Sequence, residues 1–164
     1  MATVTEKNLS DAAYRVFMPS EATHEEERFH GKVRCVIVTP ERAVLDALAE
    51  LIVVPLYDGE LGVLAGRSPF VGQLGPGELR LKTGSAVARF FVDGGFVQVR
   101  NNVVNVLTAR AIPQEELTAA RVTSATQEAD AMPVTDTLSR ENKQKAQARA
   151  KAMARLLAKA VPQA

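Results

Sequence analysis

Few residues of this 164-residue chain have the type and spacing that catalysis requires. Asp58 and Glu60 are carboxylates one residue apart, and such a pair can serve as general acid and general base. They flank a glycine where a turn is expected, and nothing near them in the sequence would raise a pKa, so we interpret them as solvated turn residues. Ser68 and Ser85 have no histidine outside the N-terminal tail to activate them. We therefore predict that the chain has no catalytic residues.

Metal and nucleotide chemistry are also not expected. The two histidines, His24 and His30, and the single cysteine, Cys35, do not have the spacing of a metal-ligand set. Cys35 lies within the apolar run 33–38, where we expect a small buried side chain. No Gly-x-x-x-x-Gly-Lys-Ser/Thr loop occurs, so the usual cradle for nucleotide phosphates is missing. We predict no metal and no cofactor, and no hydrolysis of ATP by this chain alone.

The charges are balanced over the whole chain but not along it. Twenty basic and 19 acidic side chains give a net charge of +1, which does not favour a general nucleic-acid or polybasic membrane binder. Residues 140–159, however, contain one acid, Glu141, and seven basic residues: Arg140, Lys143, Lys145, Arg149, Lys151, Arg155 and Lys159. Such a segment can be a solvated face, a nucleic-acid contact or a docking surface for an acidic protein. No aromatic residue for base stacking occurs from Ile112 onward, so nucleic-acid binding is not expected.

The first 32 residues are polar and weakly acidic, apart from a short apolar cluster at 14–18. We expect a mostly disordered extension, with a short helix over 9–17 left open. The acidic residues do not fit an organellar transit peptide, and no apolar run fits a secretory signal. No run reaches the roughly 18 apolar residues of a spanning helix, so we expect membrane association only through a protein complex or at the surface.

Apolar runs between turn residues predict a dense set of strands from Lys32 to Arg110. Leu79 and Leu81 alternate with charged residues, so one face of that strand should be wet. We predict tight hairpins at Asp58-Gly59 and Gly94-Gly95, because glycine tolerates positive φ. Further turns are expected at 39–40, 75–77, 84–85 and 101–102. The nine predicted strands are 33–39, 43–48, 50–55, 60–64, 70–74, 78–83, 86–93, 96–100 and 103–110. Regular short strands indicate a sandwich or a barrel.

The pattern becomes helical after Ile112. Pro113 suits the first position of a helix, and the acids that follow it suit the first turn. Pro133 should end this helix, and Thr135 or Asp136 should cap a second one. That second helix carries an apolar stripe of Ala146, Ala150, Met153, Leu157 and Ala160. The predicted fold class is β + α, an N-terminal antiparallel β-sandwich followed by a C-terminal two-helix hairpin. We place an extension at 1–32, the sandwich at 33–112 and a regulatory helical hairpin at 113–164.

Several short motifs occur in the order found in one known family. They are Val38-Thr-Pro-Glu41, Val53-Val-Pro55, Gly59-Glu-Leu-Gly62, Leu74 with Pro76-Gly77, Leu79-Arg80, Gly94-Gly-Phe96, Asn102 and Val106-Leu107. Together with the two-helix tail, these motifs make the chain resemble the epsilon subunit of bacterial F-type ATP synthase. The resemblance extends from Val33 to Val161, about four-fifths of the chain.

The resemblance implies a non-catalytic central-stalk, or rotor, subunit. Such a subunit binds the gamma subunit and the ring of c subunits, couples proton translocation to ATP synthesis or hydrolysis, and lies peripherally at the cytoplasmic face of the bacterial plasma membrane. It also implies that Glu60 and Arg67 lie in the region that faces the c ring. Ordinary hairpin and loop polarity is an equal interpretation of these two residues. Family members commonly have histidine at the position of Arg67, and an arginine keeps its charge, so no pH-sensitive role is expected there.

The resemblance further implies that the helices inhibit ATP hydrolysis, because the basic second helix can meet acidic segments of the alpha and beta catalytic subunits. The predicted electrostatic face consists of Lys145, Arg149, Lys151 and Arg155. Ala150, Met153 and Leu157 should pack on the first helix or on gamma.

Some family members bind ATP through a motif of the form Ile/Leu-Asp-x-x-Arg-Ala. The matching stretch here, Leu117 to Val122, keeps the leucine and Arg121 but lacks the aspartate and the alanine. We therefore do not expect ATP sensing, and Arg121 is the single candidate for it. An alternative function is a free-standing β-sandwich module that binds a small ligand, with the helices as an oligomerisation tail. Such a module would be self-sufficient or self-associated, whereas a rotor subunit should form a one-to-one complex with gamma.

Overall fold

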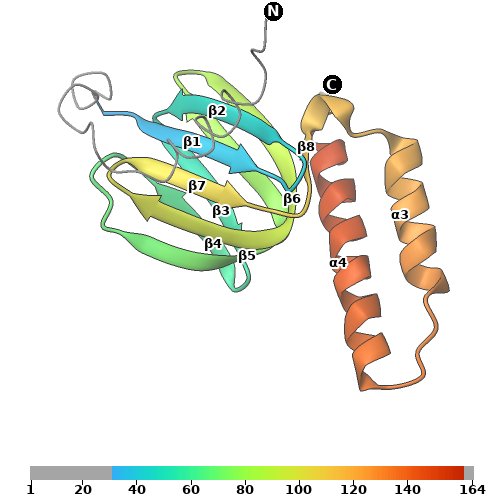
Figure 1. Cartoon of the computed structure of the whole chain (residues 1–164). Helices are drawn as coiled ribbons and strands as arrows, with labels where there is room; N and C mark the ends of the chain where they lie inside the picture. The colour runs from blue at the N-terminus through green and yellow to red at the C-terminus, as the bar shows by residue number, and fades with distance from the viewer. Residues whose placement is uncertain (1–30, 161–164) are drawn as a thin grey trace, which may run out of the picture. The chain divides into compact units, whose positions relative to one another are not determined.

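The computed structural model describes residues 31–160, so the predictions made for residues 1–30 lie outside the described residues. Figure 1 shows the arrangement of strands and helices. The described part contains eight strands: β1 (Val33–Val38), β2 (Ala43–Ala49), β3 (Leu51–Leu56), β4 (Gly59–Val63), β5 (Phe70–Thr83), β6 (Ala86–Arg100), β7 (Val103–Leu107) and β8 (Ala111–Pro113). They pair in the order β2-β1-β7-β6-β5-β3-β4, and β8 pairs with β6. The predicted β-sandwich is confirmed, with one parallel pair, β1 and β7, among the antiparallel ones.

Two long strands replace four of the predicted short ones. Gly94 and Gly95 do not close a hairpin but lie inside β6, with φ of 65° and 107°. Residues 75–77, predicted as a turn, likewise lie inside β5, where Pro76 is opposite Asp93. The positive φ angles here bend a strand that continues, so residues 90–92 pair with β8 while residues 96–100 pair with β7. A Cβ at Gly95 would lie 1.9 Å from the carbonyl oxygen of Leu107, so this close approach requires glycine.

The other four predicted turns are present. Thr39 and Pro40 lie in the turn between β1 and β2, where the N–H of Thr39 donates to the carbonyl oxygen of Arg42 at 2.9 Å. The β3–β4 turn ends at Gly59, whose φ is 155°, and the β5–β6 turn contains Gly84, whose φ is 58°. Asn101 and Asn102 connect β6 to β7 with φ of 50° and 59°. Asparagine tolerates this left-handed conformation better than other non-glycine residues, which explains why the pair forms the turn.

The sandwich buries the inward-facing positions of its strands. Its core includes Ile37, Ile52, Val54 and Val97, which are fully buried. Leu79 is also buried, as the alternation of residues 78–82 predicts. Cys35 is a buried member of the same core, and its burial, together with the negative charge of Asp46, raises the pKa of its thiol to about 12. The cysteine is therefore an uncharged, small apolar side chain, as predicted.

The helical part begins later than predicted. Pro113 is the last residue of β8, opposite Phe90, and is not the first residue of a helix. Ile112 is buried opposite Phe91. Because this pairing holds residues 111–113 in the sheet, the strand continues through Pro113, where the sequence predicted the start of a helix. A 3-10 helix, η2 (Gln114–Glu116), follows, and then α3 (Ala119–Ala131) and α4 (Thr137–Ala158). The break at Met132 and Pro133 is confirmed.

Capping explains where both helices start. Thr118 precedes α3, and its side chain accepts the backbone N–H of Arg121 at 3.3 Å. Asp136, rather than Thr135, caps α4, because its carboxylate accepts the N–H of Ser139 at 2.7 Å while the Ser139 hydroxyl accepts the N–H of Asp136. The 22 residues of α4 give a helix of about 33 Å.

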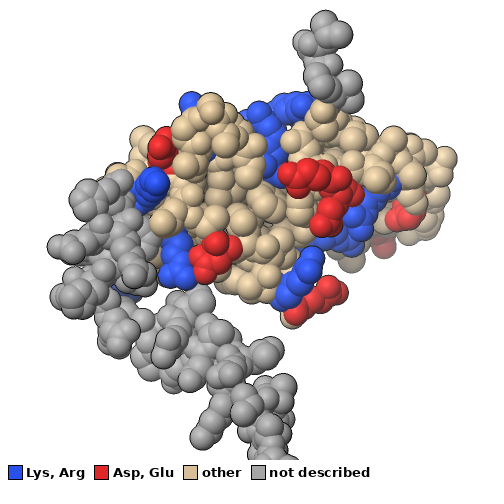
Figure 2. All heavy atoms as spheres, turned by 90° about the horizontal axis from the view of Figure 1, so that it is seen from above, with Lys and Arg blue, Asp and Glu red and all other residues tan. Residues whose placement is uncertain are grey.

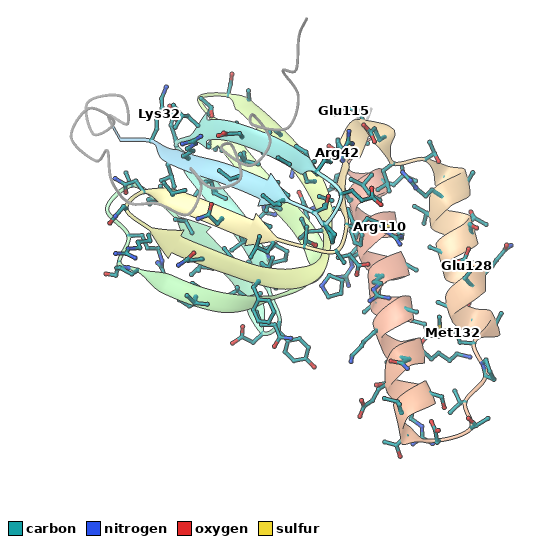
Figure 3. All side chains as sticks on the ribbon, viewed as in Figure 1. Lys32, Arg42, Arg110, Glu115, Glu128 and Met132 are labelled. Atoms are coloured by element: carbon teal, nitrogen blue, oxygen red, sulfur yellow. The ribbon has the colours of Figure 1, made fainter. Side chains whose placement is uncertain are left out.

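Helix α4 lies between the sandwich and α3, and the two helices run side by side (Figure 1). In Figure 3, Glu115 and Met132 lie near opposite ends of the hairpin. The predicted apolar stripe is correct at Ala150 and Met153, which are buried, but Leu156 is buried in place of Leu157, which is half-buried, and Ala160 is exposed.

Candidate functional site

The candidate site is the contact between the sandwich and the hairpin, where α4 packs on β5 and β6. An apolar cluster lies at its centre, and it is separate from the core of the sandwich. Its buried members are Phe91, Ile112, Leu117, Met153 and Leu156. Burial of one such side chain stabilises a contact by about 1.5–3 kcal/mol, so this cluster stabilises the packing of the hairpin on the sandwich.

Asp93 contacts the hairpin at one end of this cluster. Its backbone N–H donates to the carbonyl oxygen of Arg110 at 3.0 Å and lies 3.2 Å from the Thr108 hydroxyl, which fixes the residue just before the bend in β6. Its carboxylate accepts a hydrogen bond from Nε of Arg149 on α4 at 2.5 Å. The Asp93 side chain is only 10% exposed, whereas that of Arg149 is 47% exposed. In this ion pair the Asp93 carboxylate of the sandwich is nearly buried, whereas the Arg149 side chain of α4 remains partly exposed to water.

Glu78 makes the equivalent contact from β5. It lies opposite Phe91 in the strand register, and its side chain is 10% exposed. Its carboxylate pairs with Arg89 and with Lys159 at the end of α4, and Arg80 lies 3.8 Å away. Burial would raise the pKa of Glu78, but the hydrogen bonds from Lys159 and Arg89 outweigh it and hold the pKa below its usual value. The acid is therefore ionised at neutral pH and attracts the C-terminal end of α4.

A third polar contact ties the connecting segment to α4. The side-chain amide of Gln114 donates to the carbonyl oxygen of Leu156 at 2.9 Å. The last carbonyls of a helix lack partners within the helix, so this bond also satisfies one of them.

The two helices are linked to each other by a different set of residues. Lys143 donates to the carbonyl oxygens of Asp130 and Met132 at 2.8 and 3.1 Å, and Gln147 donates to the Asp130 carboxylate at 3.0 Å. A groove of about 370 Å³ between the helices is lined in part by Ala150 and Lys151. Because these contacts lie within the hairpin, it can hold together as one element.

Of the four cations predicted to form an electrostatic face, Arg149 and Lys151 lie in different surroundings on α4. Arg149 faces the sandwich, whereas Lys151 is two residues further on and therefore about 200° around the helix. Arg155 lies one turn beyond Lys151 and is exposed, and Lys145 is exposed one turn before Arg149. On the face of the molecule seen in Figure 2, basic and acidic side chains of the described residues are interspersed.

Arg121 and the two predicted c-ring residues lie apart from the sandwich–hairpin contact. Arg121 is exposed near the start of α3 and does not line the groove between the helices. Glu60 lies on β4, at one edge of the sheet, and accepts a hydrogen bond from Arg80 at 2.6 Å. Arg67 is exposed in the loop beyond the other end of β4. The loop that holds Arg67 lies against the β6–β7 turn, because the N–H of Gly66 donates to the side chain of Asn102 at 2.7 Å, so the structure does not bring Arg67 together with Glu60 on the β4 edge.

Sequence reasoning missed both acids of the interface. The alternation of residues 78–82 indicates correctly that Glu78 points away from the core, and Asp93 precedes two glycines. Neither signal shows that a helix will cover these carboxylates. The one available clue was the excess of cations in the second helix, which acids elsewhere in the chain can pair with.

Within the described residues, no group of three or more histidine, cysteine, aspartate or glutamate side chains could hold a metal ion. None of the helices between residues 31 and 160 is both long and apolar enough to cross a membrane.

Comparison with known proteins identifies the sandwich. Residues 32–114 match the family described as ATP synthase, Delta/Epsilon chain, beta-sandwich domain. The chain belongs to this family. The predicted resemblance is thereby confirmed, and this epsilon-family chain is a subunit of an enzyme complex and not itself catalytic.

Curated relatives agree with this assignment. The ATP synthase epsilon chain of Rhodopirellula baltica is 54% identical over 101 residues, which cover 62% of this chain and 79% of that protein. The epsilon chain of Symbiobacterium thermophilum is 42% identical over 96 residues, covering 58% of this chain and 69% of that one.

A solved structure extends the likeness beyond the sandwich. A chain in the cryo-EM structure of the Euglena gracilis mitochondrial ATP synthase, with its c-ring, aligns with a TM-score of 0.71 and 26% identity. The alignment covers 88% of this chain and 93% of that chain, so it includes residues of the hairpin as well as the sandwich. A chain of the Tetrahymena thermophila central stalk and c-ring aligns with a TM-score of 0.62 at 13% identity, covers 77% of this chain and 96% of that one, and shows the fold alone.

Proposed function

We propose that this epsilon-family chain is a rotor subunit of the central stalk of F-type ATP synthase. In this role it links the gamma subunit to the c ring, so that proton translocation is coupled to ATP synthesis or hydrolysis. The observation that carries the proposal is the family match over residues 32–114, joined to a structural relative from an assembly that contains the c-ring. The alternative of a free-standing ligand-binding module has no comparable support.

The same proposal includes a regulatory role for α3 and α4. We infer that the hairpin leaves the sandwich and that α4 then meets acidic segments of the alpha and beta catalytic subunits, which hinders ATP hydrolysis. The separation of the two apolar clusters supports this inference, because the hairpin can detach without disturbing the core of the sandwich. The cations at 140–159 supply the charge that acidic partners would attract. On this proposal the chain lies peripherally at the cytoplasmic face of the plasma membrane, held there by the complex.

Contacts with the c ring are proposed at Glu60 and Arg67. Both residues are exposed; Glu60 lies on the edge strand β4, and Arg67 lies in the loop between β4 and β5. Polar groups of loops from c subunits could pair with them, whereas Arg80 already pairs with Glu60 in the isolated chain.

The test compares two forms of the protein in ATP hydrolysis by the cognate catalytic head containing gamma. One form is full length and the other ends at Glu116, so that β8 and its pairing with β6 are kept. We expect both forms to bind and only the full-length form to slow hydrolysis. If both bind and neither slows hydrolysis, the helices are not inhibitory. If neither binds gamma, the rotor assignment is wrong.

A further inference from the structure

The strand register places two acids of the sandwich on either side of an apolar contact. Glu78 lies opposite Phe91 in the β5–β6 pair, and Asp93 is two residues beyond Phe91 on the same face of β6. On α4, Arg149 and Lys159 lie ten residues apart, about 15 Å along the helix, with Met153 and Leu156 between them. The two surfaces are therefore complementary. The sandwich presents Phe91 with an acid on either side, and α4 presents Met153 and Leu156 with a cation on either side.

We propose that Glu78 and Asp93 form a two-point electrostatic latch that holds the hairpin on the sandwich by occupying Arg149 and Lys159. In the docked state these carboxylates take the place of the acidic partner surface that α4 meets after release. The second half of this statement rests on the proposed inhibitory function, whereas the latch itself does not.

The exposure of the paired groups makes the latch reversible. Both acids are 10% exposed while docked, whereas both cations are 47% exposed. The cations can therefore approach a competing acid from solvent before they leave the sandwich. The acids regain full hydration when the hairpin leaves, which lowers the cost of opening.

The positions of Lys151 and Arg155 determine the order in which an acidic partner can replace the two acids of the sandwich. Lys151 and Arg155 are exposed on the side of α4 that faces away from Asp93. An acidic surface can contact these two while the hairpin is still docked. Arg149 and Lys159 are partly exposed while docked, but full contact with them requires the latch to open, so binding of such a partner favours the released state.

The latch is tested by measuring the distance between spin labels on the sandwich and on α4 in the full chain. The exposed residues Ser85 and Ala148 are replaced by cysteine and labelled. The native Cys35 is buried and its pKa is about 12, so its thiol stays protonated and is not labelled. The variant E78Q/D93N keeps every cation of α4. We expect it to raise the ratio of released to docked molecules about tenfold.

Two controls separate the latch from general effects. D46N removes an acid that pairs with Arg34 within the sandwich, and it should leave the distance distribution unchanged. Exchanging the charges at one point, as D93R with R149D, should restore docking that D93R alone disrupts. If E78Q/D93N gives the same distribution as D46N, or if the exchanged pair fails to restore docking, the latch is wrong.

Hydrolysis by the catalytic head separates the latch from the proposed function. If E78Q/D93N is released more often and also inhibits hydrolysis more strongly than the native chain, both statements hold. If it is released more often but hydrolysis does not change, the latch stands and the inhibitory role fails. If hydrolysis is inhibited by the native chain but the distance distribution is unaffected by E78Q/D93N, the latch fails and the inhibitory role stands.

Discussion

The core of the sandwich and its contact with the hairpin use the same kinds of side chain in different ways. The core is built from side chains of hydrogen-bonded strands, and its central residues are fully buried. The contact with the hairpin has only five buried residues, and ion pairs lie at its margins. A small apolar cluster with charged margins resembles a transient interface more than a domain interior. The difference is the one expected if the hairpin leaves the sandwich, as we propose.

The largest effect should come from the core. Ile52 is fully buried, so I52A should lower the free energy of unfolding of the sandwich by about 3–4 kcal/mol. Chemical denaturation followed by circular dichroism measures this loss. The matched control is V71A, because Val71 is 68% exposed on the same sheet and should change stability by less than about 0.5 kcal/mol. A small effect of I52A would mean that the sandwich core is not the stable part of the chain.

A slightly smaller effect is expected at the bend in β6. G95A should destabilise the sandwich by about 3 kcal/mol, because the added Cβ would meet the carbonyl oxygen of Leu107 and φ is positive. G84A is the control, since Gly84 also has positive φ but no atom within 4 Å of an added Cβ, and it should cost about 1 kcal/mol. Equal losses in the two variants would show that the close approach to Leu107 is unimportant.

A substitution in the contact should separate the two regions. L156A removes a buried side chain of α4 and should weaken docking by about 2–3 kcal/mol, while the denaturation midpoint of the sandwich stays unchanged. The label distances described above report docking, and denaturation reports the sandwich. L138A, at an exposed position of α4, should affect neither. If L156A lowers the sandwich midpoint as much as I52A does, the two regions form one cooperative unit.

The smallest effect concerns pH. Burial raises the pKa of Glu78, but hydrogen bonds from Lys159 and Arg89 lower it by more, and release of the hairpin removes the bond from Lys159 and leaves Arg89 in place. The contribution of Glu78 to docking is therefore full above its pKa in the released chain and is lost as pH falls through the lower docked value. The basic groups that face Glu78 are Arg80, Arg89 and Lys159. The native chain should therefore dock better than E78Q at pH 7, and the difference should disappear in acid. A difference that grows on acidification would show that Glu78 does not contribute as a carboxylate.

The sequence allowed most of the sandwich to be predicted, because alternation and turn residues are local signals. Leu79 and Leu81 illustrate this, as does the Asp58-Gly59 turn. Gly94-Gly95 was interpreted incorrectly because glycines with positive φ serve equally well to reverse a chain and to bend a strand. Only pairing with distant strands decides between the two. The same limit applies to Ile112, whose burial against Phe91 extends the sheet into a segment with helix-start residues.

The candidate contact could be predicted less well, for a related reason. The residues of its two ion pairs are 56 and 81 positions apart, far beyond any local pattern. The abundance of cations in the second helix was visible, but their partners depend on how the helix lies on the sheet. Arg149 and Lys151 look equivalent in the sequence. The two-residue step between them places their side chains about 200° apart around the helix, so they have different surroundings.

The short connection between β8 and α3 has a consequence for how any competitor must act. Only residues 114–118 join the last strand to the first long helix, so a detached hairpin stays tethered within reach of the sandwich. Re-docking is then a first-order event whose effective concentration is of millimolar order for a short link. A freely diffusing acidic molecule at cellular concentration would compete poorly against it. A competitor must itself be held nearby, so the opening of the hairpin should report whether the chain is assembled in its complex, rather than how much of any soluble ligand is present.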